Sequence, residues 1–193
     1  MIVDFEGIDG LGKTTQALAF RQMLEVEIGV RAKYVKFPNG RLLNWIIRRM
    51  LRTGSALKYT NVFQSLQWLD KLIFQIFVLP FIYLRYDVIV MDRWSPTMFA
   101  YGLSSGANVN MTHFFARTII NPDVIFLFKG KNMRRDPQAA DCYENNTTMQ
   151  DTIDKNYREW VDCYGQDVKI VEVQANDTFE NVSSTIKKRL LNL

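Results

Sequence analysis

One short segment near the start of the chain constrains the fold more than any other feature. Residues 7–14 read GIDGLGKT and fit the pattern G-x-x-x-x-G-K-[ST], between an apolar run that predicts a strand over Ile2 to Glu6 and a stretch that predicts a helix from Thr14 to about Gly29. Glycines let the backbone N–H groups of such a loop surround an anion, and the start of the helix adds positive charge at the same place. The segment therefore predicts a phosphate-binding loop.

Strands and helices are predicted to alternate along the rest of the chain, which is typical of an α/β fold. Further strands are predicted over Arg31 to Phe37, Asp87 to Met91, Val124 to Phe128 and Val168 to Val173. Further helices are predicted over Arg41 to Arg52, Asn61 to Leu84, Thr148 to Tyr164 and Thr178 to Leu191. No linker rich in Gly, Pro or Ser divides the 193 residues, so one domain over residues 1–193 is expected.

The segment between the strand at Val124 to Phe128 and the next helix is predicted to be a mobile lid. Residues 130–146 show no apolar period, and the segment is long for a passive connection. It carries two adjacent arginines, Arg134 and Arg135. Such a segment could close over a bound anion.

Composition and charge exclude several classes of protein. A hydrophobic fraction of 48% excludes a disordered chain, and two cysteines exclude a disulfide scaffold. The net charge of +4 is scattered in short basic clusters, which suits phosphorylated small molecules better than nucleic acid. No targeting segment is visible at the start, so a cytoplasmic protein is expected.

The most apolar stretch, Leu72 to Leu84, spans about 13 residues, which is too short to cross a bilayer, and Pro80 interrupts it. We therefore expect no membrane span and predict a buried helix here. Because this helix is apolar on every side, one sheet cannot cover it completely. The stretch therefore predicts a homodimer interface.

A phosphate-binding loop alone is compatible with kinases, motor-type ATPases, GTPases and sulfotransferase-like proteins. The chain has no N/T-K-x-D segment of the kind that reads a guanine base, and it is too short for an oligomeric motor with its accessory elements. A small kinase is left.

Five segments, taken together and in order, resemble the thymidylate kinase family. They are Phe5 to Gly10 with Gly12 to Gln16, Lys36-Phe37-Pro38, Met91 to Trp94, Asn121-Pro122-Asp123, and Asp141 to Asn145. The resemblance covers nearly the whole chain. It implies a doubly wound fold with a five-stranded parallel sheet in the order 2-3-1-4-5, and transfer of the γ-phosphoryl group of ATP to a deoxynucleoside 5′-monophosphate.

On the ATP side, the loop motif predicts that Lys13 bridges the β- and γ-phosphates and that Thr14 binds Mg²⁺. The resemblance implies that Asp92 organises the same ion. It also implies a catalytic arginine in the lid, where a count back from Tyr143 favours Arg135 over Arg134. The predicted catalytic residues are Lys13, Asp92, Arg93 and Arg135, and the predicted ATP-binding residues are Gly7, Gly10, Gly12, Lys13, Thr14, Thr15, Arg134 and Arg135.

On the acceptor side, the resemblance implies that Asp9 accepts a hydrogen bond from the sugar 3′-hydroxyl, that Phe63 stacks on the base and that Tyr101 disfavours a ribose. Arg41 is the nearest cation for the acceptor phosphate, although it stands one position away from the family's arginine. The predicted acceptor-binding residues are Asp9, Phe37, Pro38, Arg41, Phe63, Gln67, Arg93, Tyr101 and Tyr143.

Two positions depart from the family pattern. Gln67 stands where an arginine commonly reads the thymine edge, and an amide could pair with a pyrimidine edge or admit another base, so the base preference stays open with dTMP favoured. Cys142 replaces a common arginine of the lid. Two alternatives also stay open: a deoxynucleoside kinase, and a catalytically silent nucleotide-binding regulatory protein of the same fold.

Overall fold

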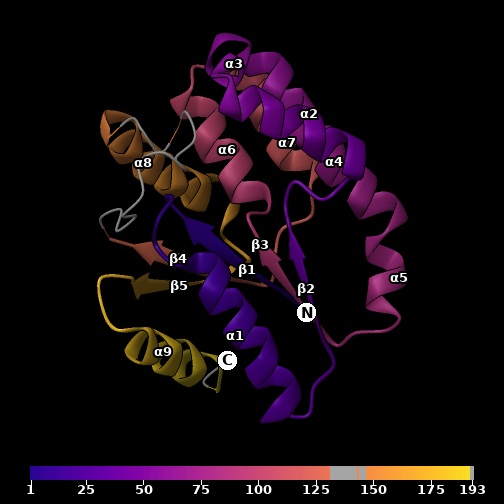
Figure 1. The fold of residues 1–193 in the computed structure, drawn as a ribbon, viewed down its shortest axis with the longest axis vertical. Coiled ribbons are helices and arrows are strands. Elements are labelled where there is room, and N and C mark those ends of the chain that lie inside the picture. The colour runs from indigo at the N-terminus through magenta and orange to yellow at the C-terminus, as the bar shows by residue number, and fades with distance from the viewer. Residues whose placement is uncertain (131–142, 144–146, 192–193) are drawn as a thin grey trace.

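A five-stranded parallel sheet forms the centre of the molecule (Figure 1). The structure, a computed structural model, describes residues 1–130, 143 and 147–191. The strands are β1 (Ile2–Gly7), β2 (Ala32–Lys36), β3 (Val88–Asp92), β4 (Val124–Lys129) and β5 (Lys169–Gln174). Their order is β2-β3-β1-β4-β5, so the predicted α/β fold and strand order are confirmed.

Helices cover both faces of the sheet (Figure 1). On one face lie α1 (Lys13–Val26) and α9 (Phe179–Leu191). The other face carries α4 (Thr60–Phe77), α6 (Ser95–Ser104), α7 (Val109–Thr118) and α8 (Thr147–Tyr164). Beyond them lie α2 (Arg41–Arg52) and α3 (Ser55–Lys58), which pack near α4, and α5 (Leu79–Tyr83) follows α4.

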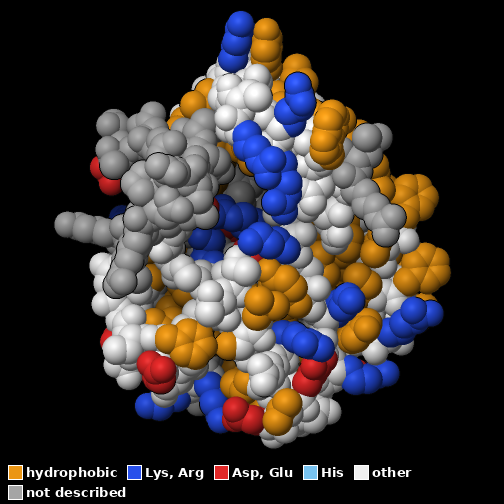
Figure 2. All heavy atoms as spheres, viewed as in Figure 1, with side chains coloured by type: hydrophobic (Ala, Val, Ile, Leu, Met, Phe, Trp, Pro, Cys, Tyr) orange, Lys and Arg blue, Asp and Glu red, His pale blue; other side chains and the backbone are white. Residues whose placement is uncertain are grey.

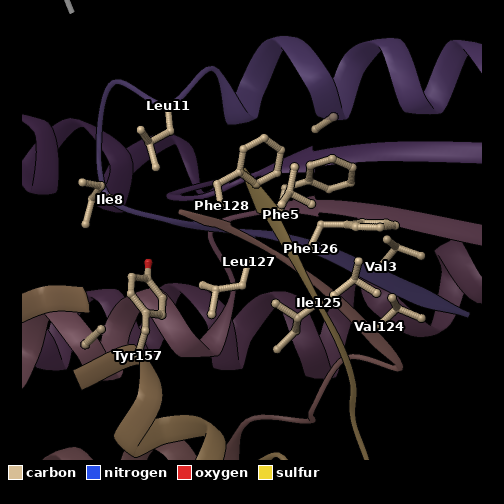
Figure 3. Close-up of a cluster of buried hydrophobic side chains, with 14 of the residues drawn as sticks. Val3, Phe5, Ile8, Leu11, Val124, Ile125, Phe126, Leu127, Phe128 and Tyr157 are labelled. Carbon is tan, nitrogen blue, oxygen red and sulfur yellow. The ribbon is translucent and has the colours of Figure 1, made fainter. Parts of the chain in front are cut away.

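Alternating side chains of the central strand serve the two faces of the sheet. Val3 and Phe5 point to the α1 side, where the Phe5 ring lies 5.5 Å from the Phe20 ring and 5.3 Å from the Phe126 ring (Figure 3). Burial of each such ring stabilises the fold by about 1.5–3 kcal/mol. Asp4 and Glu6 point to the opposite face, so two carboxyl groups are buried in the interior on that side of the sheet.

The helix predicted over Asn61 to Leu84 is two helices. Because proline lacks an N–H group and disfavours a helical conformation at the residue before it, α4 ends at Phe77 and α5 starts anew with Pro80 in its first turn. One side of this stretch is not covered within the chain, as its apolar character on every side led us to expect: Phe77 and Phe81 are each 64% exposed and Leu84 is 80% exposed. None of the described helices combines the length and the apolar character that a membrane span requires.

The sequence interpretation gave no bounds for α3, α6 and α7. In α6 every residue from Ser95 to Gly102 is buried, so no contrast between an apolar and a polar face marks a helical period. Pro96 and Gly102 are also residues that favour a loop prediction. Burial on all sides, which only packing produces, therefore concealed this helix.

Candidate active site

The loop between β1 and α1 has the backbone conformation that its glycines predict. A Cβ atom at Gly7 would lie 2.5 Å from the carbonyl oxygen of Phe128, and Gly12 has a φ of 74°, a region that side chains other than glycine rarely adopt. The Lys13 ammonium donates a hydrogen bond to the carbonyl of Ile8 within the loop. Burial, and secondarily the positive charge of Arg93, lowers the pKa of Lys13 to about 7.

Asp92 lies at the end of β3, directly beside this loop. Phe5 of β1 is its register partner, so the carboxyl ends of the two parallel strands meet at one edge of the sheet. The Thr14 hydroxyl donates to Asp92 Oδ2 at 2.6 Å, and the Tyr34 hydroxyl donates to the same oxygen at 2.8 Å. The Lys36 ammonium lies 3.6 Å from this oxygen and donates to the Thr14 hydroxyl at 2.9 Å.

The other carboxylate oxygen of Asp92 is buried and has no hydrogen-bond partner among the described residues. A buried carboxylate oxygen beside a threonine hydroxyl is a suitable donor set for Mg²⁺, which prefers hard oxygen ligands. In the part of the chain that the structure describes, no group of three or more His, Cys, Asp or Glu side chains could hold a metal. Mg²⁺ is commonly bound by one or two protein ligands together with substrate phosphates and water.

Arg93, Asp9 and Tyr101 form a compact polar triangle next to the loop. The Arg93 guanidinium pairs with one carboxylate oxygen of Asp9, and the Tyr101 hydroxyl donates to the other at 2.6 Å. Burial and the Asp9 carboxylate raise the pKa of Tyr101, so this hydroxyl stays a donor at neutral pH. Arg93 has a φ of 72°, and a left-handed conformation costs a residue with a side chain about 1–2 kcal/mol, a strain that is typical of ligand sites.

A cavity of about 290 Å³ opens beside this triangle. It brings together seven of the nine residues predicted to bind the acceptor: Asp9, Phe37, Pro38, Gln67, Arg93, Tyr101 and Tyr143. Among the residues that the structure describes, four cationic side chains and one carboxylate, that of Asp9, line it; the cations are Lys36, Arg48, Lys71 and Arg93. On the face of the molecule that Figure 2 shows, blue Lys and Arg side chains gather in a central hollow. The cavity therefore suits an anionic ligand.

The other two predicted acceptor residues are Phe63 and Arg41. Neither is among the described residues that line the cavity. Phe63 is fully buried behind the cavity wall, and its ring centroid lies 6.2 Å from that of Tyr143, which does line the cavity. The backbone of Arg41 begins α2, but its side chain lies outside the described part of the structure. Arg134, Arg135 and Cys142 of the predicted lid also lie outside the described residues.

The sequence interpretation assigned no role to Glu6, which the structure buries beneath the site, two residues behind Ile8 and next to Gly7. Its buried carboxylate accepts hydrogen bonds from the Trp94 backbone N–H at 2.9 Å, the Thr97 backbone N–H at 3.2 Å and the Tyr157 hydroxyl at 2.9 Å. These contacts join β1, the start of α6 and α8. An ionisable residue inside an apolar strand was the signal that could have found it.

Lys71 and Arg48 were missed for a different reason. Lys71 stands directly before the apolar stretch that starts at Leu72, where a charged residue ordinarily marks the end of a buried segment. Arg48 lies in a helix with several basic residues, which is ordinarily explained by a solvated helix face. Only the packing of α2 and α4 around the cavity shows that both side chains line it.

A larger cavity of about 590 Å³ is lined by Ile8 of the same loop. It extends from Ile8 to the ends of β4 and β5 and to α8, where Lys129 pairs with Asp154 at 2.6 Å. Neighbouring residues of the loop therefore line both cavities, Ile8 the larger one and Asp9 the smaller one.

Comparison with known proteins agrees with this geometry. The family model for thymidylate kinase matches residues 5–186. The chain is 31% identical over 132 residues to a thymidylate kinase of Thermosipho melanesiensis, a match that covers 65% of this chain and 64% of that protein. It is 28% identical over 131 residues to a thymidylate kinase of Ehrlichia canis, covering 66% of this chain and 64% of the relative.

A third relative matches over almost its full length. The chain is 24% identical to a probable thymidylate kinase of Thermococcus kodakarensis, with 96% of this chain and 95% of the relative covered. The matches to the first two relatives span just under two thirds of those proteins. Because the family model covers most of the sequence and the sheet order and loop geometry agree with it, this chain belongs to the thymidylate kinase family.

Proposed function

We propose that this protein transfers the γ-phosphoryl group of ATP to a deoxynucleoside 5′-monophosphate, with dTMP as the favoured acceptor. The observation that carries the proposal is the position of Asp9: it belongs to the phosphate-binding loop and also lines the cationic cavity. A ligand in this cavity therefore lies next to the loop. The printed names of the relatives, all thymidylate kinases or probable ones, support the same reaction.

On the donor side, Lys13 and the loop N–H groups would bind the β- and γ-phosphates. Thr14 and Asp92 would hold Mg²⁺, which supplies charge neutralisation on the phosphates when bound. Phosphoryl transfer depends mainly on bringing two anionic groups into line and compensating their charge. Arg135 is proposed to add the last positive charge when the lid closes, which would also exclude water.

On the acceptor side, Arg93 would bind the phosphate and Asp9 would accept a hydrogen bond from the sugar 3′-hydroxyl. The Tyr101 ring would occupy the space that a 2′-hydroxyl needs. Gln67 faces the same cavity and would read the base edge. Because an amide binds less strongly than a guanidinium, we expect looser base discrimination than an arginine would give.

The cationic lining favours a phosphorylated acceptor over a free nucleoside. Of the four cations among the described lining residues, Arg93 pairs with Asp9 and Lys36 lies near Asp92, so positive charge is left over that a dianionic phosphate would compensate and an uncharged sugar would not. For this reason a monophosphate kinase is favoured over a deoxynucleoside kinase.

A homodimer through α4 and α5 is part of the proposal. Several large apolar side chains of this surface are exposed: Leu69, Ile73, Ile76, Phe77, Val78, Phe81 and Leu84. A contiguous apolar surface of this kind is typical of subunit interfaces. A cytoplasmic location stays a prediction.

A steady-state assay with ATP and Mg²⁺ tests the function. The acceptors are dTMP, dUMP, dCMP, dGMP, UMP and thymidine, compared by kcat/KM. We expect dTMP to be a good acceptor, UMP a poor one and thymidine inert. Preference for thymidine would indicate a nucleoside kinase, and absence of any transfer would indicate a regulatory protein. A tenfold preference for dGMP, equivalent to about 1.4 kcal/mol, would contradict the pyrimidine assignment.

A further inference from the structure

Lys71 is a buried cation on the cavity wall to which neither the family resemblance nor the proposed reaction assigns a role. It lies on α4 four residues after Gln67, so the two side chains share one face of the helix. Both line the 290 Å³ cavity that also contains Arg93. The side chain of Lys71 is only 2% exposed, and a lysine is almost never buried to this extent without a partner.

The ammonium group of Lys71 makes no hydrogen bond or ion pair with any residue that the structure describes. It lies over the face of the Phe37 ring, 5.1 Å from the ring centroid. A cation–π contact compensates only part of the cost of burying an ammonium, which has three donors. The group therefore lacks an acceptor of its own.

The carboxylates that could pair with Lys71 are occupied elsewhere or too distant. Asp70, its neighbour in sequence, accepts the backbone N–H groups of Asn39 and Gly40, each at 2.7 Å. Glu6 accepts from Trp94, Thr97 and Tyr157. Neither Asp4 oxygen has a hydrogen-bond partner among the described residues, and no ion pair within 4.0 Å joins Asp4 to Lys71. The unused donors are thus available to a ligand in the cavity.

We propose that Lys71 binds the 5′-phosphate of the acceptor nucleotide together with Arg93, and so is a specificity residue that selects a monophosphate over a nucleoside. This inference rests on the proposed function. Lys71 is buried and Arg93, which pairs with Asp9, is partly buried in the same cavity. An anion between the two cations would give Lys71 the acceptor that it lacks, and the phosphate is the strongly anionic group of a nucleoside monophosphate.

The ionisation of Lys71 is compatible with this role. Burial lowers its pKa to about 8, and the positive charge of Arg93 also lowers it, whereas Asp70, Glu6 and Asp4 raise it. The group is therefore mostly charged at neutral pH and can donate to a phosphate.

Calorimetric titration of dTMP and of thymidine tests the inference, because the two ligands differ only in the phosphate. The proteins compared are the parent, Lys71→Met, Lys71→Gln, Lys71→Arg and the control Lys33→Met. Lys33 is a matched control because it also lies over an aromatic ring, that of Tyr86 at 5.8 Å, but on the exposed surface. Circular dichroism verifies folding, and the glutamine variant replaces the methionine variant if the latter does not fold.

We expect either neutral variant to weaken dTMP binding by about 10- to 100-fold, the usual worth of a charge-assisted hydrogen bond, and to change thymidine binding less than about twofold. Lys71→Arg should stay within a few fold of the parent, and Lys33→Met should equal it. Equal losses for both ligands would place Lys71 at the base or in the fold, and no loss would make it a counter-charge for Asp4 and Glu6. Either result overturns the inference.

The parent protein separates this inference from the proposed function. If the parent binds dTMP but transfers no phosphoryl group, the proposed function fails while the ratio of dTMP to thymidine losses still decides the role of Lys71. If the parent phosphorylates dTMP and the neutral variants bind it normally, the inference alone fails. If the parent binds no nucleoside monophosphate, both are overturned.

Discussion

The Thr14 hydroxyl donates a hydrogen bond to Asp92 Oδ2 over 2.6 Å, although 78 positions separate the two residues. Thr14 lies in the first turn of α1, and Asp92 ends β3 next to the central strand. The contact therefore depends on the order of the strands, because β3 is the direct neighbour of β1. It holds the two proposed magnesium ligands side by side.

The first prediction concerns this pair. Asp92→Asn should raise the Mg²⁺ concentration needed for half-maximal activity by about tenfold or more, because an amide is neutral and a weaker ligand for this cation. Asp87→Asn is the control, since Asp87 is an exposed carboxylate that directly precedes the same strand and pairs with Arg31. Activity titrated with Mg²⁺ at saturating ATP measures the effect. An unchanged Mg²⁺ dependence would remove Asp92 from the metal site.

The second prediction concerns the loop lysine. Lys13→Ala should lower phosphoryl transfer by at least about 100-fold, because the ammonium compensates charge that develops on the transferred group. The fold should survive, since a buried lysine with a lowered pKa costs stability in its charged form. Single-turnover rates and circular dichroism, with Lys33→Ala as the surface control, test both statements. A loss smaller than tenfold would contradict the assignment.

A third prediction follows from the pKa of Lys13, which burial lowers to about 7. At pH 8 the free protein holds this lysine mostly neutral, and contact with ATP phosphates raises its pKa by adding opposite charge. ATP binding at pH 8 should therefore take up a fraction of a proton, and ATP affinity should fall as pH rises above 7.

Calorimetric titration in two buffers with different ionisation enthalpies measures this proton uptake. Lys13→Met is the matched control, because it retains the length of the side chain and cannot titrate. Equal uptake by the parent and by this variant would show that another group takes the proton.

A fourth prediction concerns Asp4, a buried carboxyl group in the middle of β1. Burial, followed by the charge of Glu6, raises the pKa of Asp4 well above its usual value. The folded state thus holds the proton of the Asp4 carboxyl group more tightly than the unfolded state does. The contribution of protonated Asp4 to the free energy of unfolding is therefore present at low pH and is lost as the pH rises through the folded-state pKa.

Asp4→Asn should flatten that part of the pH dependence and raise the free energy of unfolding at pH 8 relative to the parent. Urea unfolding between pH 5 and pH 9 tests it, and Asp87→Asn, an exposed carboxylate whose pKa is lowered by Arg31, should show no such flattening. An Asp4→Asn variant that is less stable at pH 8 would indicate that the charged carboxylate stabilises the fold.

The fifth prediction concerns the apolar surface of α4 and α5. Phe81→Glu should shift a dimer toward monomer, because a carboxylate in an apolar interface loses its hydration without a partner. Phe179→Glu is the control, as Phe179 is an exposed aromatic residue at the start of α9 on the opposite helical layer. Sedimentation at micromolar concentration distinguishes the states. A parent protein that is monomeric at this concentration would contradict the dimer.

Much of this protein could be predicted from local patterns in the chain. The glycines, Lys13 and Thr14 identify the phosphate-binding loop, because its conformation depends on a few adjacent residues. Runs of β-branched residues identify the buried strands, and the resemblance supplied the strand order that the structure confirms. In contrast, the apolar pattern predicted one helix from Asn61 to Leu84, whereas the structure has two, with Pro80 in the first turn of the second.

Only the tertiary structure decided which charged side chains share the site. Glu6 receives its donors from α6 and α8, and Lys71 reaches the cavity of Arg93 from a different helix. These contacts depend on strand register and on how helices pack across the sheet, which are set by the whole chain together. The sequence by itself therefore determined the phosphate-binding loop and the strands, whereas packing alone brought the distant cations and carboxylates together, because local patterns do not specify where side chains from separate elements converge.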